Sequence, residues 1–103
     1  DRIKLRQALL NLLRNAQEAI SRPDGKILLR AEPLEKGICI SVSDNGCGIP
    51  PSEKNNIFNP FVTFKKNGTG LGLAVTRQII EAHNGHIETD SQPGHGSTFR
   101  IFL

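Results

Sequence analysis

The fold is decided by residues 2–20, which run R-I-K-L-R-Q-A-L-L-N-L-L-R-N-A-Q-E-A-I. The stretch contains neither glycine nor proline, and its apolar side chains share one arc of a helical wheel, at Leu5, Ala8, Leu9, Leu12, Ala16 and Ile20. Turn residues at 21–25, among them Pro23, cannot continue a helix. We therefore predict an amphipathic helix from Arg2 to about Ile20 that packs its apolar face on the rest of the domain.

Two strands are predicted directly after this helix. Residues 26–31 and 37–43 have strand composition, with Ile38, Ile40 and Val42 alternating, and residues 32–36 are expected to connect them. The simplest arrangement is a pair of adjacent antiparallel strands.

The C-terminal part of the chain is predicted to add a second helix and two more strands. Residues 71–82 return to helical periodicity, with Asn84-Gly85 at the helix end. Strands are expected at 86–91 and 97–103, around the turn-rich residues 92–96. The expected fold class is α+β, a two-layer α/β sandwich with helices on one face of a mainly antiparallel, mixed sheet.

Between these parts lies a long segment, residues 44–70, that is rich in glycine, proline and asparagine. Within it, residues 52–58 are a short helical possibility. Loops of this length inside compact domains are usually functional or disordered, and glycines near both ends provide hinges. We predict a lid over about residues 48–69.

Composition excludes several classes of protein. A chain of 103 residues fits one domain, and its net charge of +3 is only a weak indication of an anionic partner. The absence of Trp and Tyr leaves few platforms for stacking bases, which argues against a single-stranded nucleic-acid binder. Cys39 and Cys47 fit neither a disulfide framework nor a zinc site and favour a reducing cytosol. No apolar run is long enough to span a bilayer.

Three polar residues share one side of the first helix beside the leucine stripe: Asn11, Asn15 and Glu18. Asparagine is a poor helix former, so the presence of two asparagines within this helix needs an explanation. They are either surface or hydrogen-bonded structural residues, or ligands for Mg²⁺ that phosphates already chelate, since an amide oxygen is a hard neutral ligand.

Two glycine-containing segments are candidate ligand sites. Asp44 follows a strand and opens D-N-G-C-G-I-P, which is either an ordinary turn or a carboxylate beside backbone that a ligand can approach closely.

Residues 68–73, G-T-G-L-G-L, open the second helix and are either a hinge or a row of N–H groups that bind phosphate; Lys65 and Lys66 favour phosphate. The dinucleotide fingerprint, the P-loop and the H-R-D and D-F-G motifs of protein kinases are all missing.

Neither the phenylalanines nor the histidines indicate a further catalytic centre. Residues 57–64 hold several of the phenylalanines, which form either a small core beneath the lid or a latch that docks on ligand binding. His83, His86 and His95 lack the spacing of a zinc enzyme, so surface or turn roles are favoured.

In chain order, five motifs resemble the catalytic, ATP-binding domain of two-component sensor histidine kinases, a branch of the superfamily of DNA gyrase, MutL and the heat-shock chaperone ATPases. They are Gln7–Ile20 as the asparagine box, Asp44–Pro50 as the first glycine box, Ile57–Phe64 as the phenylalanine box, Gly68–Leu73 as the second glycine box and Gly94–Phe99 as the last glycine box. Each motif alone is weak, but five in order are specific. The resemblance covers nearly the whole chain and implies a Bergerat-type ATP-binding fold.

The resemblance implies roles for single residues. Asp44 would accept a hydrogen bond from the adenine amino group, and Ser97 would help to fix the adenine ring through water. Asn15 would coordinate Mg²⁺ between the phosphates, with Asn11 assisting one turn earlier. Lys65 would reach the terminal phosphates.

The glycine and phenylalanine boxes supply the other implied contacts. Gly46 and Gly48 would let the backbone pass close to the nucleotide, and Phe58 and Phe61 would latch the lid. The implied phosphate-binding set is Gly68, Gly70, Leu71, Gly72 and Leu73, of which Gly70, Leu71 and Gly72 would give backbone N–H groups.

The resemblance also implies a reaction. Hydrolysing members of the superfamily carry a glutamate four residues before the metal-binding asparagine, where this chain has Asn11, and a neutral amide cannot be that base. Transfer of the γ-phosphoryl group to a histidine on a separate helical dimerisation domain is therefore favoured over ATP hydrolysis. The alternatives are a module that only binds nucleotide and an ATP-hydrolysing relative.

Further expectations concern the surroundings of the domain. The family domain usually has a strand and a helix before this point, so we expect an N-terminally truncated domain that does not phosphorylate itself efficiently. The expected partners are ATP or ADP, the phosphoacceptor domain and, indirectly, a response regulator, without nucleic acid or direct membrane contact. We expect a cytoplasmic, monomeric fragment of a homodimeric parent that is compatible with membrane anchoring.

Overall fold

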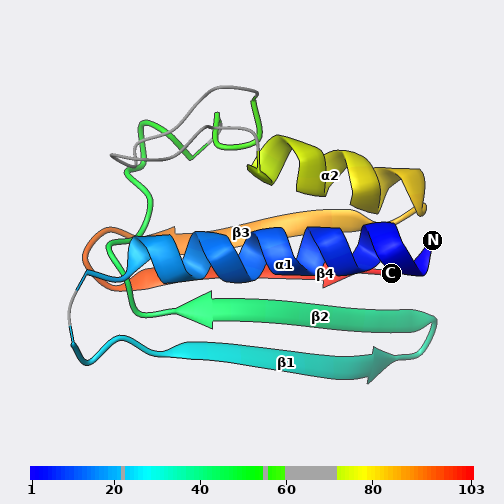
Figure 1. Cartoon of the computed structure of the whole chain (residues 1–103), viewed down its shortest axis with the longest axis horizontal. Helices are drawn as coiled ribbons and strands as arrows, with labels where there is room; N and C mark the ends of the chain where they lie inside the picture. Colours follow the sequence, from blue (N-terminus) through cyan, green and yellow to red (C-terminus); the bar gives the residue numbers. More distant parts are fainter. Residues whose placement is uncertain (22, 55, 60–71) are drawn as a thin grey trace.

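The computed structural model of the protein describes residues 1–21, 23–54, 56–59 and 72–103. The helices and strands are α1 (Arg2–Ala19), β1 (Ile27–Leu34), β2 (Gly37–Asp44), α2 (Gly72–Ala82), β3 (His86–Gln92) and β4 (Gly96–Phe102). In this part of the chain both helices pack on one face of a four-stranded sheet of order β1-β2-β4-β3, whose neighbours are all antiparallel (Figure 1). The expected α+β sandwich is confirmed.

The first helix agrees closely with the prediction. Asp1 caps its N-terminus, since Asp1 Oδ1 accepts hydrogen bonds from the backbone N–H groups of Ile3 at 2.9 Å and Lys4 at 3.2 Å. Its buried residues are Ala8, Leu12, Ala16 and Ala19. The helix ends at Ala19 because the backbone of Ile20 is extended, with φ −94° and ψ 122°. The predicted apolar stripe therefore faces the core.

The predicted β1–β2 hairpin is confirmed, but its connection is shorter than expected. β1 continues to Leu34, so only residues 35 and 36 remain as the turn before Gly37, whose φ is +117°. Pro33 lies within β1, opposite Ile38. A proline is tolerated there because β1 is an edge strand, where a backbone N–H that points away from the sheet has no ladder partner to lose.

The C-terminal helix and hairpin also follow the sequence pattern. α2 ends where Asn84 adopts a left-handed conformation, with φ +62°, and the Gly85 N–H donates to Ile80 O at 3.0 Å. Asparagine, rather than the neighbouring glycine, thus supplies the left-handed residue of the cap. β3 and β4 then pair over their whole lengths, from His86 opposite Phe102 to Gln92 opposite Gly96.

Side chains on the helix-facing side of the sheet form rows across β2, β4 and β3. One row is Val42, Phe99 and Thr89, and the next is Ile40, Ile101 and Ile87. Phe99 is among the largest fully buried side chains, and its burial contributes about 2 kcal/mol to folding. These rows, with Leu12 of α1 and Ile80 of α2, form the core beneath the helices.

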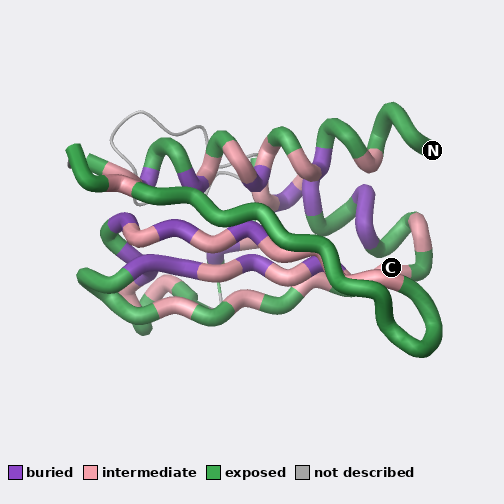
Figure 2. Tube along the Cα trace, turned by 90° about the horizontal axis from the view of Figure 1, so that it is seen from below, coloured by how far each residue is buried: buried purple, intermediate pink, exposed green. Residues whose placement is uncertain are grey.

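At the edge of the sheet, β1 contributes little to this core. All of its residues are exposed (Figure 2). Leu28 and Leu29, which point to opposite faces of the sheet, expose 56% and 49% of their surface. Separately, neither described helix combines the length and apolar character needed to cross a membrane.

Candidate functional site

A polar row closes the core at the end of the sheet where β2 finishes. Asp44, Ser97 and Ser91 are neighbours across β2, β4 and β3, one row beyond Val42, Phe99 and Thr89. Asp44 and Ser97 are both buried. Buried polar side chains at the edge of an apolar core are costly to keep, so this row marks a candidate ligand site.

The Asp44 carboxylate is held at the start of the loop that follows β2. Its Oδ1 accepts a hydrogen bond from the Gly46 backbone N–H at 2.9 Å. Ser97, opposite Asp44 on β4, adds a hydroxyl to the same row. An ionised carboxylate can accept hydrogen bonds but cannot donate one, so this position suits a ligand that presents N–H donors.

Contacts with distant parts of the chain fix the loop at residues 45–49. Asn45 Oδ1 accepts from the Lys26 N–H at 2.7 Å, and Asn45 Nδ2 donates to Asp24 O at 3.1 Å. The Cys47 N–H donates to Ala19 O at 3.0 Å, at the end of α1. On the other side, the Gly94 N–H donates to Cys47 O at 2.8 Å. The loop is therefore joined to the start of β1, to α1 and to the β3–β4 hairpin.

The glycines of this region are required by close backbone packing. A Cβ at Gly46 would collide with Ala19 O, and one at Gly48, where φ is +73°, would collide with Gln92 O. A Cβ at Gly96, where φ is +119°, would collide with Asp44 O. The resemblance implies that Gly46 and Gly48 make room for a nucleotide. In the structure, both positions must be glycine because the protein's own backbone oxygens leave no space for a side chain.

One of the two predicted asparagines of α1, Asn11, contacts the start of α2. Asn11 Nδ2 donates to Gly72 O at 3.4 Å, and Thr76 Oγ1 donates to the same carbonyl at 2.8 Å. Asn15 is half-buried and lies one turn further along the same side of α1. The structure thus brings Asn11 together with Gly72, which belongs to the segment that the resemblance implies binds phosphate.

Phe58 packs on the core close to the polar row. Its ring meets Phe99 edge-on at a centroid distance of 6.4 Å, and the Arg77 guanidinium lies 5.5 Å from its ring centre. Leu73 packs against the buried cluster, so its side chain belongs to the core. The short helix considered possible at 52–58 is not formed by residues 52–54 and 56–58, which make successive turns; in one of them the Glu53 N–H donates to Pro50 O at 2.9 Å.

Several predicted site residues lie outside the described part of the chain: Phe61, Lys65, Gly68, Gly70 and Leu71. Half of the predicted lid, residues 55 and 60–69 of 48–69, lies there too. The roles assigned to them from the sequence stay predictions.

Metal binding by histidine or cysteine finds no support in the structure. Within residues 1–21, 23–54, 56–59 and 72–103, no His, Cys, Asp and Glu side chains gather into a group that could hold a metal ion. His83 Nδ1 lies 2.7 Å from Ile79 O, at the end of α2, and His86 stacks on Phe102. Both fit the structural roles expected from the sequence. The ligands of a cation bound beside α1 would therefore be the side-chain amides of Asn11 and Asn15 and the phosphates of a bound ligand.

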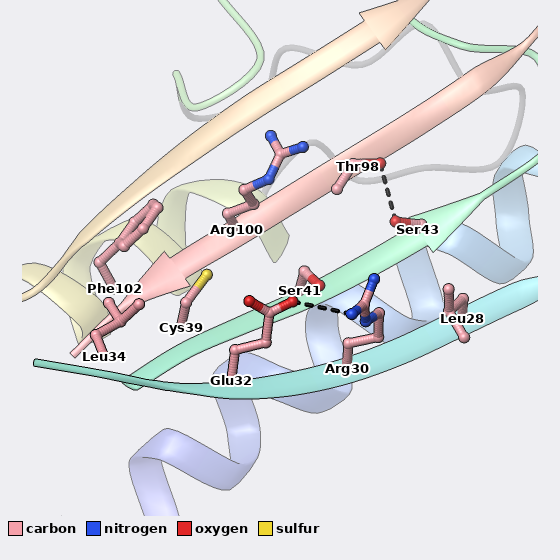
Figure 3. A pocket seen from close by; sticks show the side chains of 10 residues that line it. All are labelled: Leu28, Arg30, Glu32, Leu34, Cys39, Ser41, Ser43, Thr98, Arg100 and Phe102. Carbon is pink, nitrogen blue, oxygen red and sulfur yellow. Dashed lines mark hydrogen bonds and ion pairs between the residues drawn. The ribbon is translucent and has the colours of Figure 1, made fainter. Parts of the chain in front are cut away.

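A groove lies on the opposite face of the sheet, away from the polar row (Figure 3). This groove of about 390 Å³ is lined by β1, β2 and β4. Arg30 pairs with Glu32 at 3.0 Å within it, and the Ser43 and Thr98 hydroxyls are 2.9 Å apart. None of the predicted site residues lines the groove, so it is not the candidate site.

Ser91 is the polar-row residue that sequence reasoning missed. It lies in a strand whose side chains alternate in exposure, and nothing in its neighbourhood in the sequence marks it as unusual. The signal lies in the strand register, because pairing Ser91 with Ser97 places a second hydroxyl beside a predicted site residue.

Comparisons with known proteins identify the family of the chain. The family model described as histidine kinase-, DNA gyrase B-, and HSP90-like ATPase matches residues 1–103. The chain is 49% identical over 104 residues to the signal transduction histidine-protein kinase AtoS of Escherichia coli (strain K12). It is 45% identical over 104 residues to the C4-dicarboxylate transport sensor protein DctB of Rhizobium meliloti (strain 1021). Both alignments cover 100% of this chain and 17% of the relative.

Solved structures of sensor histidine kinases also resemble this chain. The mycobacterial sensor histidine kinase MprB superposes with a TM-score of 0.88 at 34% identity, over 100% of this chain and 71% of that one. Full-length ShkA in complex with AMPPNP superposes with a TM-score of 0.85 at 34% identity, over 97% of this chain and 21% of that one. Because the family model spans the whole chain, this protein belongs to the histidine kinase-, DNA gyrase B- and HSP90-like ATPase family, in the branch of the sensor histidine kinase catalytic domains.

Proposed function

We propose that this chain binds Mg²⁺·ATP and positions its γ-phosphoryl group for transfer to a histidine on a separate helical domain. The observation that carries the proposal is the buried Asp44 carboxylate, held by the Gly46 N–H beside Ser97. The exocyclic amino group of adenine donates hydrogen bonds, whereas guanine has an accepting oxygen at that position. An acceptor such as Asp44 therefore favours adenine.

The phosphates belong at the other end of the site, between α1 and the start of α2. Asn15 would offer an amide oxygen to a Mg²⁺ ion that accompanies the phosphates. Gly72 begins α2, where free backbone N–H groups attract anions. Asn11 supports this end by its hydrogen bond to Gly72 O. Lys65, with Gly68, Gly70 and Leu71, completes the phosphate contacts in the proposal.

The reaction is a phosphoryl transfer to nitrogen. An imidazole nitrogen of the acceptor histidine attacks the γ-phosphorus, a P–N bond forms, and the bond from the γ-phosphorus to the bridging oxygen breaks as ADP leaves. Mg²⁺ held at Asn15 would neutralise charge on the phosphates, and the chain contributes orientation. Asn11 is a neutral donor to Gly72 O and cannot take a proton from water, which supports transfer over hydrolysis.

The proposal includes the protein's surroundings. The aligned regions are 17% of the length of AtoS and DctB, which leaves ample chain in those proteins for a phosphoacceptor domain. We place the chain in the cytoplasm, within a homodimeric kinase that passes its phosphoryl group to a response regulator. Phe58 and Phe61 latch the predicted lid over the bound nucleotide.

The experiment incubates the parent protein, or this chain with the helical domain, with γ-labelled Mg²⁺·ATP. An acid-labile, base-stable phosphohistidine is expected, and Asp44→Asn should abolish it by weakening nucleotide binding. Asp90→Asn is the matched control, because Asp90 is an exposed carboxylate on β3. Nucleotide binding without any transfer supports the binding-only module, and release of free phosphate supports a hydrolase; either result would sink the transfer proposal.

A further inference from the structure

Ser91 connects the candidate site to its supporting hairpin through one oxygen atom. Its Oγ accepts a hydrogen bond from the Ile49 N–H at 2.8 Å and donates to Gly96 O at 3.1 Å. The same Oγ lies 2.8 Å from Ser97 Oγ. Ser91 is thus bonded to the loop after β2, to the turn before β4 and to the hydroxyl opposite Asp44.

Proton accounting fixes the direction of these bonds. A serine hydroxyl has one proton to donate and two lone pairs to accept with. The Ile49 N–H can only donate and Gly96 O can only accept, so all three hydrogen bonds form together only when the Ser91 proton points to Gly96 O. The Ser97 hydroxyl must therefore donate its own proton to Ser91 Oγ. What Ser97 retains toward a ligand is acceptor capacity alone.

Asp44 and Ser97 consequently present the same polarity. Both are acceptors, and they are neighbours across β2 and β4. A base that donates a hydrogen bond fits both groups. A water that gives one proton to each also presents only lone pairs to the base, so the preference survives a bridging water. The amino group of adenine satisfies this arrangement, and the oxygen of guanine does not.

We propose that Ser91 is a positioning and specificity-determining residue: it holds Ser97 as a hydrogen-bond acceptor, so that the site selects adenine over guanine. The inference rests on the proposed nucleotide-binding function. It assigns Ser91 an effect on base selectivity through Ser97, without direct contact with the nucleotide.

The test compares ADP and GDP binding by calorimetry in the parent protein, with Mg²⁺ present. Ser91→Ala removes the acceptor for the Ser97 proton, so Ser97 can donate to the guanine oxygen. The ratio of ADP to GDP affinity is expected to fall about tenfold, the scale of one neutral hydrogen bond. Ser91→Thr keeps the hydroxyl and should restore the ratio. If Ser91→Ala does not fold, Ser91→Cys, which keeps the volume but accepts hydrogen bonds weakly, carries the test.

Matched variants separate this role from a loss of stability. Ser43→Ala breaks a comparable hydroxyl pair, with Thr98, on the opposite face of the sheet and should leave the ratio unchanged. In a Ser97→Ala background, Ser91→Ala should no longer alter the ratio, since it acts through Ser97.

The outcomes are distinct for the two proposals. A wild-type protein that binds no ADP overturns the proposed function, and this inference with it. A wild-type protein that binds ADP, with an unchanged ratio in Ser91→Ala, overturns the role of Ser91 alone. An equal fall of the ratio in the Ser97→Ala background overturns it as well.

Discussion

Asp44 and Ser97 are register partners across β2 and β4, and they expose only 9% and 6% of their surface. Their spacing is set by the backbone ladder of two core strands, one row from Val42 and Phe99. The base-recognition end of the proposed site is therefore built directly on two core strands. Side chains that are fixed before a ligand arrives lose little freedom on binding.

The metal role of Asn15 can be separated from general binding. Asn15→Ala is expected to weaken binding of Mg²⁺·ADP about tenfold, the scale of one lost hydrogen bond or ligand contact, with little change in metal-free ADP binding. Calorimetry with Mg²⁺ or EDTA measures both. Gln17→Ala, at an exposed position on α1, is the control. Equal losses with and without Mg²⁺ would contradict the assignment of Asn15 as a metal ligand.

Gly96 is predicted to be indispensable for folding. Gly96→Ala must accommodate a Cβ against Asp44 O at a φ of +119°, and we expect a loss of roughly 3 kcal/mol or more in unfolding free energy. Gly94→Ala is the matched control, since its φ is +80° but nothing lies within 4 Å of a Cβ there. Its cost should be only about 1 kcal/mol, from backbone strain. Urea denaturation compares them, and equal losses would show that the contact with Asp44 is unimportant.

Thr89 offers a stabilising substitution. Its Oγ1 is buried, and no described group hydrogen-bonds to it. Thr89→Val removes a hydroxyl that loses its water on folding, and should raise the unfolding free energy by about 1 kcal/mol. Thr98→Val is the contrast, because the Thr98 hydroxyl bonds Ser43 at 2.9 Å and its loss should not stabilise. Thermal unfolding compares the melting temperatures of the wild type and the two variants. A lower melting temperature for Thr89→Val than for the wild type would refute the prediction.

Asn45 is predicted to contribute to stability through its backbone contacts. Asn45→Ala removes the acceptor for the Lys26 N–H and the donor to Asp24 O, and should cost about 2 kcal/mol of unfolding free energy. Asn56→Ala loses only an exposed side-chain contact with Asn59 at 3.4 Å, so its effect should stay within about 0.5 kcal/mol. Denaturant unfolding of both variants makes the comparison. Equal effects would mean that the loop is held without Asn45.

Local patterns predicted the elements well because those patterns reflect burial. The stripe that includes Ala8, Leu12 and Ala16 faces the core, and the alternation of Ile40 and Val42 places both on the helix-facing side of the sheet. The β1–β2 connection was predicted too long because Pro33 is a poor strand residue by propensity, whereas an edge strand accepts it.

Non-local relationships were beyond the sequence. The hydrogen bond from Ile49 to Ser91 joins residues 42 positions apart, and only the strand register brings Ser91 beside Ser97. The reason for Gly48 also escaped prediction, because the obstacle is the backbone oxygen of Gln92 in the distant hairpin. A glycine in the sequence indicates that some group packs closely against the backbone there, but it does not identify that group.

The loop at residues 45–49 has a consequence for folding. It is bonded to Ala19, to Asp24 through Asn45 and to Gly94, positions spread over most of the chain. These contacts exist only when the sheet is complete, so the site cannot form in a partly assembled domain. Ligand binding and global folding are then thermodynamically linked, and any molecule that occupies the site should protect the whole domain, including the β3–β4 hairpin, from unfolding.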